Sequence, residues 1–357
     1  MSTKKLVVVR GGSKRIAQAD FFSCFKKFEI KFLADLKFKP WFLIDPIKLI
    51  QGKTSHRSWN KVIGLEKYLK EVDVVNTLEM VYFFSAQAAG LAQKHKKLMT
   101  TTIWTSFPHP SWFIPPYCFN VRKTLKLTDL FLAKSNRAAE NYLRFLKVPE
   151  KKIKVIFPGV NLKRFYPPKR KTWQGIRVLF VGQLVESKGL DDLLAVFPKL
   201  SRQFSKLELW ICGQGKLEDR LNQASREWPI KYLGFVDYLK MPDIYRSVDI
   251  FIMPSKDVYH LGIKFGEEFF SYVLLEAMAS GLPIITSRCG GIEEEVGKEN
   301  LLIRQGDRKA ILKALVGLVS DQEARKQLGR KNRKRAKKLF DLKKQARKTE
   351  EAILKFL

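Results

Sequence analysis

The chain has 357 residues, 45% of them hydrophobic, and a formal net charge of +32. This length allows two domains with separate cores, and the hydrophobic content excludes wholesale disorder. No apolar run approaches the ~20 residues of a membrane-spanning helix, and the N-terminus lacks the apolar core of a signal peptide. The four cysteines are scattered without metal-type or disulfide-type spacing, which is typical of reduced thiols. We therefore expect a cytoplasmic protein.

The positive charge predicts a polyanionic partner. We do not expect nucleic acid, because the sequence has no zinc-finger spacing, no RNP-like aromatic block and no basic-region heptads. Basic residues alternate with bulky apolar ones over residues 25–32 and 37–42. This pattern favours peripheral binding to an anionic membrane surface on the inner leaflet. The competing interpretation is that lysine is simply the default surface residue here.

In the first half, residues 6–9 form a predicted buried strand, and Gly11 and Gly12 precede a predicted helix over 14–27. Strand, glycine turn and helix open a doubly wound domain. Further strands are predicted over 72–75, 97–104, 130–133 and 154–157, with helices over 82–95 and 138–146. Such alternation favours a parallel sheet. Because prolines and a glycine interrupt residues 31–70, we expect loops and short elements there.

The second half repeats this alternation after a boundary marked by two prolines and a basic run at 167–171. Strands are predicted over 178–181, 207–212, 230–233, 250–253 and 283–287. The predicted fold class is α/β, with two Rossmann-like doubly wound domains that face each other across a cleft. We place the first domain at 1–167 and the second at 168–340.

Within residues 251–297, two carboxylates eight positions apart, Glu268 and Glu276, lie where a loop is expected to turn into a helix that ends at Gly281. The amides of a helix start attract a phosphate, which the carboxylates would repel. The two glutamates are therefore expected to bind hydroxyl groups on either side of a diphosphate. A nucleotide sugar has such groups on its sugar and on its ribose. The competing interpretation is an amphipathic helix with two solvated glutamates.

Residues 268–276 resemble the E-x7-E signature of the retaining family-4 glycosyltransferases, and four further blocks resemble this family in the same order. These blocks are residues 157–165, 179–189, 209–215 and 232–236. The resemblance implies the GT-B fold, in which the last helix, about 341–357, packs back on the first domain.

The resemblance also implies how the donor diphosphate is held. Lys188 would neutralise the leaving group beside Gly182 and Gln183. The family usually has arginine where Gln183 stands, which leaves Lys188 alone or with Arg177 or Lys264 as a second cation.

We assign further candidates more loosely. His109 follows a predicted strand end where the family often has a histidine, although Trp104 takes that position by strand register. Gly11 and Gly12 would let the backbone approach the donor diphosphate or the acceptor, or they form only a tight turn. The full set of candidates comprises the catalytic residues Glu268, Lys188 and His109, the donor-binding residues Glu276, Gln183, Gly182, Ser271, Tyr272, Val273, Phe235, Val236 and Gly215, and the acceptor-side glycines Gly11 and Gly12.

The expected activity is retaining hexosyl transfer from a nucleotide-sugar donor to a lipid-linked or saccharide acceptor, in cell-envelope polysaccharide or glycolipid biosynthesis. We expect no cofactor and no metal, because no Asp-x-Asp pair lies in a suitable loop. One alternative is a non-enzymatic polyanion-binding protein on a degenerate transferase fold. Another is a sugar-nucleotide epimerase or hydrolase. Donor sugar, base, linkage and oligomeric state stay open.

Overall fold

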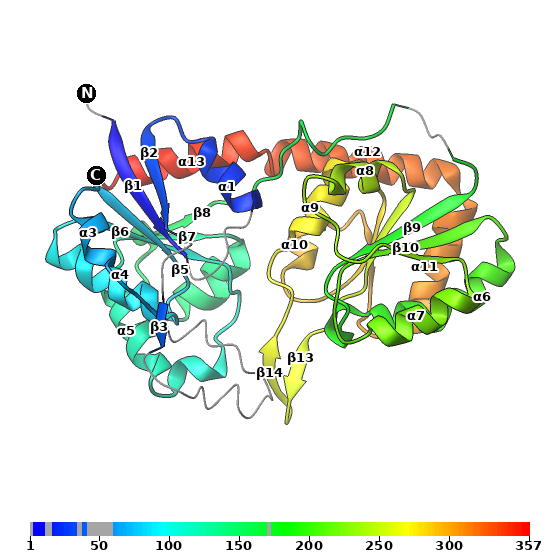
Figure 1. Ribbon diagram of the computed structural model, residues 1–357, viewed down its shortest axis with the longest axis horizontal. Helices are drawn as coiled ribbons and strands as arrows, with labels where there is room; N and C mark the ends of the chain where they lie inside the picture. Colours follow the sequence, from blue (N-terminus) through cyan, green and yellow to red (C-terminus); the bar gives the residue numbers. More distant parts are fainter. Residues whose placement is uncertain (1–2, 11–15, 34–37, 41–59, 170–172) are drawn as a thin grey trace. The chain divides into compact units, whose positions relative to one another are not determined.

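The computed structural model describes residues 3–10, 16–33, 38–40, 60–169 and 173–357. The chain divides into two compact units. Unit 1 comprises Met1–Gly159 and Leu342–Leu357, and unit 2 comprises Val160–Asp341. Each unit is a parallel six-stranded sheet with helices packed on both faces (Figure 1). The predicted α/β class with two Rossmann-like domains is confirmed.

The sheet of unit 1 has the strand order β2-β1-β5-β6-β7-β8. In β1, Leu6 and Val8 belong to one buried cluster and Val7 and Val9 to another on the opposite face. Both faces are covered, so the strand reads as an uninterrupted apolar run. The strands are β1 (Lys4–Val9), β2 (Phe28–Leu33), β5 (Val74–Leu78), β6 (Leu98–Ile103), β7 (Leu130–Ala133) and β8 (Ile153–Val155).

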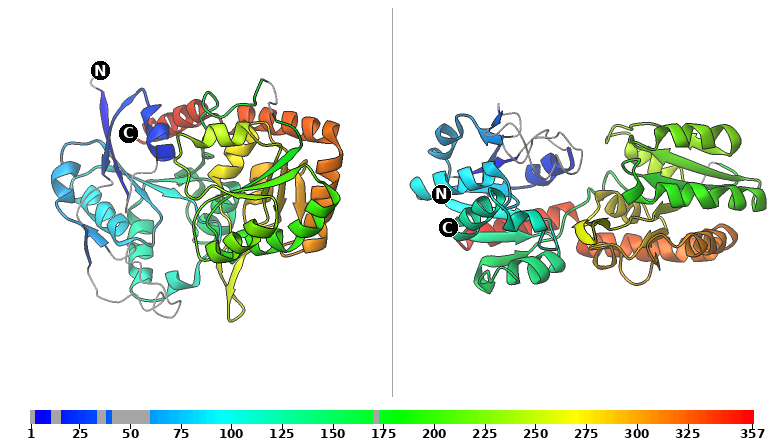
Figure 2. Two further views of the ribbon diagram at one scale, coloured as in Figure 1. Left: turned by 45° about the vertical axis from the view of Figure 1, so that its right-hand side comes forward. Right: turned by 90° about the horizontal axis from the view of Figure 1, so that it is seen from below.

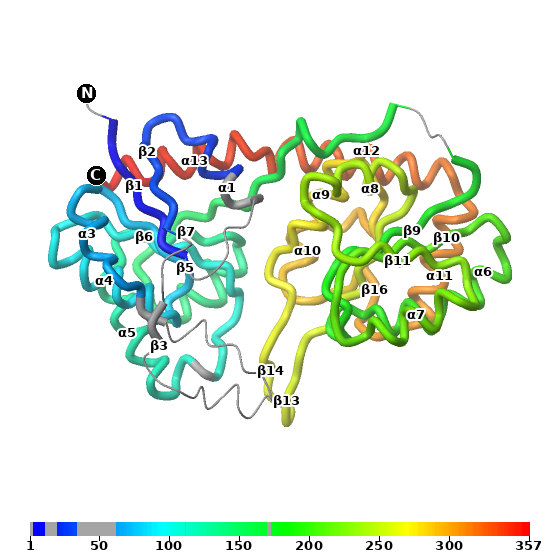
Figure 3. The backbone as a smooth tube through the Cα atoms, in the orientation of Figure 1, coloured from blue at the N-terminus to red at the C-terminus, as the bar shows by residue number. Residues whose placement is uncertain are grey.

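Helices from distant parts of the chain cover this sheet. The last helix, α13 (Leu342–Leu354), contributes Leu342, Ala346 and Ile353 to the same cluster as Phe21. The tube in Figure 3 ends in this helix, coloured red. The remaining elements are α1 (Ile16–Ser23), α3 (Leu65–Leu69), α4 (Phe83–Lys94), η2 (Pro110–Phe113), α5 (Tyr117–Leu127), the π-helical η3 (Ala138–Arg144), η4 (Glu150–Lys152) and the antiparallel pair β3 (Phe38–Pro40) and β4 (Asn60–Val62).

The sheet of unit 2 has the strand order β11-β10-β9-β12-β15-β16. Its strands are β9 (Ile176–Val181), β10 (Leu207–Cys212), β11 (Ile230–Tyr232), β12 (Ile250–Met253), β15 (Ile284–Ser287) and β16 (Leu301–Ile303). Its helices are η5 (Glu186–Lys188), α6 (Leu190–Gln203), α7 (Glu218–Glu227), α8 (Met241–Arg246), α9 (Tyr272–Ala279), α10 (Ile292–Val296), α11 (Arg308–Ser320) and α12 (Gln322–Leu339).

An antiparallel hairpin between β12 and α9 was not predicted, because we expected only a loop there. It consists of β13 (Val258–His260) and β14 (Ile263–Gly266), and Figure 2 shows it projecting from the body of unit 2. Its turn needs positive φ at Leu261 and Gly262, at 47° and 75°. Glu268 follows this hairpin by two residues.

The basic and aromatic segment over 25–32 does not present an apolar face to a membrane. It forms β2 at the edge of the sheet, and Phe25 and Phe28 are buried in the core of unit 1. The alternation reflects an edge strand with one covered face and one solvated face, so this basis for the membrane prediction was wrong. Most of the second segment, 37–42, lies outside the described residues.

The two units divide at Gly159 and Val160 rather than at 167/168 as predicted. The amide of Val160 donates to the carbonyl of Phe340 at 2.8 Å. Arg333 of α12 donates to the carbonyls of Leu162 and Phe165. These bonds hold the segment before the two prolines on unit 2, although the prolines are the stronger breakers in the sequence.

Candidate functional site

The strand order of unit 2 reverses between β9 and β12. From β9 the chain first adds β10 and β11 on one side, and then adds β12 on the other side. In open parallel sheets, ligands bind at the carboxyl ends of strands at such a switch point. Lys188 follows β9 and Ser255 follows β12, so both segments lie at this edge.

The predicted catalytic residues Lys188 and Glu268 meet at this edge. The Lys188 ammonium forms an ion pair with Oε2 of Glu268, and the hydroxyl of Ser255 lies 3.4 Å from the same oxygen. The side chains of Lys188 and Glu268 are 23% and 14% exposed. A partly buried cation and carboxylate, 80 residues apart in the sequence, therefore form one polar centre. Ser255 was not predicted, although it directly follows the strand end that the sequence indicates.

A glycine brings the loop after β9 against the end of β12. Gly189 has a φ of +72°, and a Cβ placed there would lie 2.0 Å from the carbonyl oxygen of Pro254. Only glycine fits this conformation and this close approach. The amide of Lys256 also donates to the carbonyl of Ser187 at 2.8 Å. This contact fixes Lys188 beside Ser255.

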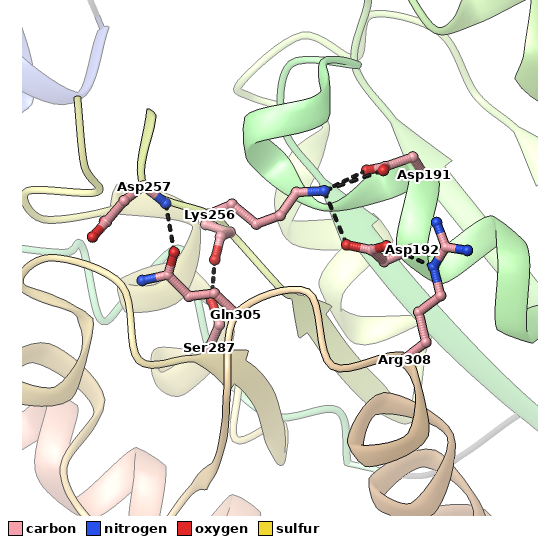
Figure 4. Close-up of polar contacts among 8 residues, drawn as sticks. Asp191, Asp192, Lys256, Asp257, Ser287, Gln305 and Arg308 are labelled. Atoms are coloured by element: carbon pink, nitrogen blue, oxygen red, sulfur yellow. Dashed lines mark hydrogen bonds and ion pairs between the residues drawn. The ribbon is translucent and has the colours of Figure 1, made fainter. Parts of the chain in front are cut away.

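Figure 4 shows the ion pairs that hold the neighbouring segments together. The Lys256 ammonium lies 3.1 Å from Asp191 and 2.9 Å from Asp192, in the first turn of α6. Arg308, at the start of α11, donates to Asp192 at 2.8 Å. Carboxylates in a first turn also complement the helix dipole. The cluster fastens α6 and α11 to the loop after β12, and it involves residues that the sequence did not single out.

Two further glycines, Gly290 and Gly291, lie against the backbone of the segment that carries Glu268. A Cβ on Gly290 would lie 2.1 Å from the carbonyl oxygen of Glu268, and one on Gly291 would lie 2.1 Å from that of Phe269. The amide of Gly291 donates to the carbonyl of Glu268 at 2.7 Å. The loop before α10 therefore supports the segment that carries Glu268.

At the start of α9, the amide of Ser271 does not have the role that we predicted for it. The amide of Ser271 donates to Glu295 at 2.8 Å, so a buried carboxyl occupies the position that we assigned to phosphate. Burial and the nearby Glu268 raise the pKa of Glu295 well above its usual range. The hydrogen-bond ladder of α9 begins at Leu274, which donates to the carbonyl of Ser271. The amides of Tyr272 and Val273 precede this ladder, and their role in phosphate binding stays a prediction.

Glu276 lies in the interior of unit 2. It is 4% exposed and accepts a hydrogen bond from the hydroxyl of Tyr245 at 3.0 Å. Burial raises the pKa of Glu276 to about 8. No sequence pattern indicated Tyr245, which also donates to the carbonyl of Val273. Contact between Glu276 and a donor hydroxyl stays a prediction.

The other donor-binding candidates follow the carboxyl ends of β9, β10 and β11. Gly182 donates its amide to the carbonyl of Cys212 at 3.0 Å, and Gly215 donates to Glu218 at 2.7 Å. Gln183 is exposed, Val236 is half-buried and Phe235 is 72% exposed. These residues gather at the same sheet edge as Lys188, as Rossmann topology requires.

Of the two cations considered to stand in for an arginine, only Lys264 lies near the polar centre. Arg177 lies at the opposite end of β9, with its guanidinium over the rings of Trp173 and Trp210, so its proposed role in the clamp was wrong. The Lys264 ammonium pairs with Asp257 at 2.8 Å and with Glu267 at 2.5 Å. Glu267 is the direct neighbour of Glu268.

The first-half candidates belong to unit 1. The ring of His109, just before η2, lies 6.1 Å from that of Trp112, and the amide of Trp104 donates to Glu79 at 2.7 Å. Gly11 and Gly12 lie outside the described residues. In the described part of the chain, no three His, Cys, Asp or Glu side chains are placed to hold a metal ion. None of its helices is both long and apolar enough to cross a bilayer.

Two family models match consecutive parts of the chain. The model of the glycosyl transferases group 1 matches residues 167–335, and the model of glycosyltransferase family 4 matches residues 34–164. The chain belongs to the group 1, family-4 type of glycosyltransferases. The residues of the polar centre, from Lys188 to Glu268, fall within the first of these matches.

This family-4 chain is 26% identical over 243 residues to sulfoquinovosyl transferase SQD2 of Arabidopsis thaliana. That match covers 64% of the chain and 45% of the relative. It is also 32% identical over 157 residues to phosphatidyl-myo-inositol mannosyltransferase of Mycolicibacterium smegmatis, and this match covers 43% of the chain and 38% of the relative. The matches thus span less than half the length of these curated relatives. The crystal structure of Anabaena HepE with UDP-glucose matches over 99% of both chains with a TM-score of 0.73 and 15% identity, and this likeness shows the GT-B fold.

Proposed function

We propose that the protein transfers a hexosyl group from a nucleotide-diphosphate donor, with retention, to a lipid-linked or saccharide acceptor. The observation that carries this proposal is the ion pair between Lys188 and Glu268 at the switch point of unit 2. A cation that can neutralise a diphosphate and a carboxylate that can accept sugar hydroxyls are the two groups that this reaction needs. The two relatives, a sulfoquinovosyl transferase and a mannosyltransferase, support the same class of reaction.

The ion pair also suggests how binding proceeds. A donor diphosphate carries more negative charge than one carboxylate, so it displaces Glu268 as the partner of Lys188. Lys188 then stabilises the charge that develops on the leaving diphosphate. The released carboxylate of Glu268 accepts hydrogen bonds from hydroxyl groups of the sugar.

Retention would follow from front-face displacement, in which the departing phosphate takes the proton of the acceptor. Transfer would rest on positioning and on charge stabilisation by Lys188 and by amides, without a divalent ion. Retention and front-face displacement rest on the family resemblance, and transfer without a divalent ion rests on the lack of an Asp-x-Asp pair in a suitable loop.

The test first identifies a nucleotide that binds, using a thermal-shift panel of nucleoside diphosphates and nucleotide sugars. Calorimetry then compares Lys188→Met and Glu268→Gln. We expect Lys188→Met to weaken nucleoside-diphosphate binding by about 10-fold or more, because a charged hydrogen bond is lost. Glu268→Gln should bind the same diphosphate at least as tightly, because Lys188 no longer has a competing carboxylate. Its transfer rate should fall by about 100-fold or more.

Glu323→Gln is the matched control, because Glu323 is 69% exposed on α12 and makes only surface ion pairs. It should leave binding and transfer unchanged. Parental transfer by Glu268→Gln, or parental nucleotide affinity of Lys188→Met, would contradict the proposed site.

A further inference from the structure

Unit 1 carries a second polar cluster at the carboxyl ends of its strands. Arg10 follows β1, Lys134 follows β7, and Asn76 and Thr100 lie on β5 and β6 between them. Because side chains alternate along a strand, Arg10 shares a face with Leu6 and Val8, and Lys134 shares that face with Leu132. The apolar core of this face therefore gives way to polar side chains at the edge of the sheet where ligands bind.

Arg10 is held in place by neighbouring polar groups. Its guanidinium donates to Oδ1 of Asn76 at 2.8 Å and to the carbonyl of Val9 at 3.0 Å. Asn76 in turn donates to the hydroxyl of Thr100 at 2.8 Å. Arg10 is only 6% exposed.

Lys134 is the second buried cation, and it is also 6% exposed. Its ammonium lies 5.0 Å from the centre of the Phe21 ring. Across residues 3–10, 16–33, 38–40, 60–169 and 173–357, no carboxylate or hydrogen-bond acceptor pairs with this ammonium. Burial and the charge of Arg10 lower the pKa of Lys134 to about 7. A buried cation without a counter-ion is costly to the fold, and a bound anion removes that cost.

We infer that Lys134 and Arg10 form a subsite for an anionic group, a phosphate ester, on the acceptor. This inference rests on the proposed function, in which Lys188 of unit 2 serves the donor diphosphate. The acceptor is then the reactant left to supply an anion to unit 1. Two cations that follow strands β1 and β7 suit a doubly charged phosphate ester, which accepts several charge-assisted hydrogen bonds.

Calorimetry with inorganic sulfate tests this subsite, because sulfate is a dianion that does not titrate near neutral pH. Measured at pH 8 in two buffers of different ionisation enthalpy, sulfate binding should be accompanied by proton uptake as Lys134 becomes charged. Lys134→Met should weaken sulfate binding by about 10-fold or more and abolish the uptake. Lys134→Arg should restore binding without uptake, because arginine is already charged.

Lys152→Met is the matched control, since Lys152 is half-buried in the same unit but donates to the carbonyl of Thr128 at 2.8 Å. It should leave sulfate binding unchanged. Lys134→Met should unfold at the same temperature as the parent or higher, which separates lost binding from lost folding. Parental sulfate affinity in Lys134→Met overturns the subsite.

A further measurement uses the nucleoside diphosphate identified in the thermal-shift panel and separates this inference from the proposed function. We expect Lys134→Met to bind this diphosphate as the parent does, and Lys188→Met to bind sulfate in unit 1 as the parent does. If Lys134→Met loses affinity for the diphosphate as strongly as for sulfate, the cations belong to the donor diphosphate and the acceptor assignment is wrong.

Discussion

At the residue scale, the decisive groups are buried ionisable side chains whose partners come from distant parts of the sequence. Lys188 and Glu268 could be singled out from the sequence because both lie in blocks that resemble a family. Glu295, Tyr245 and Glu79 could not, because nothing local indicates that each will be buried against one particular partner. Their burial is a property of the folded unit, and it changes their proton affinities.

The buried carboxyl of Glu79 should make the stability of the fold depend on pH. It accepts hydrogen bonds from the amides of Trp104 and Thr105 at 2.7 and 3.0 Å, and burial raises its pKa from 4.5 to about 7. Between pH 4.5 and about pH 7, Glu79 holds a proton in the folded chain that it has lost in the unfolded chain. The stabilisation is therefore complete below pH 4.5 and is lost as the pH rises through 7.

We expect Glu79→Gln to abolish this dependence, because the amide oxygen still accepts both hydrogen bonds but does not titrate. The difference in unfolding free energy between pH 5 and pH 7.5 should shrink by up to about 3 kcal/mol, at 1.36 kcal/mol per pKa unit. Urea unfolding across this range measures it. The exposed Glu71→Gln is the control, and an unchanged pH slope in Glu79→Gln would show that Glu79 is not protonated in the folded state.

At the element scale, the site depends on loops that follow strands and on glycines that let those loops touch. The order of strands and helices in both units follows from the alternating apolar pattern. The hairpin β13–β14 and the edge strand β2 were not predicted, because short or half-exposed strands have no distinctive period. Gly290 and Gly291 are adjacent glycines in a loop, and only the fold shows that they lie against the backbone of Glu268 and Phe269.

Gly291→Ala should therefore harm the site through packing. Gly291 has an ordinary φ of −86°, so the cost comes from the new Cβ, which would lie 2.1 Å from the carbonyl oxygen of Phe269. We expect a loss of about 1–3 kcal/mol in unfolding free energy and weaker transfer, because the Glu268 segment must shift.

Gly317→Ala is the matched control in α11, where an added Cβ meets no atom within 4 Å. It should stabilise the chain by about 0.5–1 kcal/mol, because alanine loses less backbone entropy in a helix. Denaturant unfolding and transfer assays distinguish the two variants. Equal stabilisation by both would show that the loop before α10 does not support Glu268.

At the scale of the whole molecule, the charge of +32 dominates. Much of it is exposed, as on α12, where Lys326, Arg330, Lys334 and Lys337 line an open pocket with a volume of about 430 Å³. Like charges at this density repel one another and destabilise the compact state. The same charge gives the molecule a general attraction to anions.

Salt should therefore stabilise the protein. Raising NaCl from 0.1 to 1 M shortens the screening length from about 10 Å to about 3 Å. We expect the melting temperature to rise by about 2–4 °C, which corresponds to roughly 1 kcal/mol for units of this size. Differential scanning calorimetry measures this shift. A melting temperature that falls with salt would mean that ion pairs such as those of Lys256 outweigh the repulsion.

The sequence alone determined the α/β class, the repeated Rossmann pattern and the family, and it singled out Lys188 and Glu268 as candidates, because apolar periodicity and ordered motifs are local features of the chain. The tertiary structure decided the boundary at Gly159, the carboxyl of Glu295 at the start of α9, and the burial of Glu276 and Lys134. Each of these depends on which distant segments pack together. Packing removes water from charged groups and sets their partners, and neither effect is encoded in the spacing of neighbouring residues.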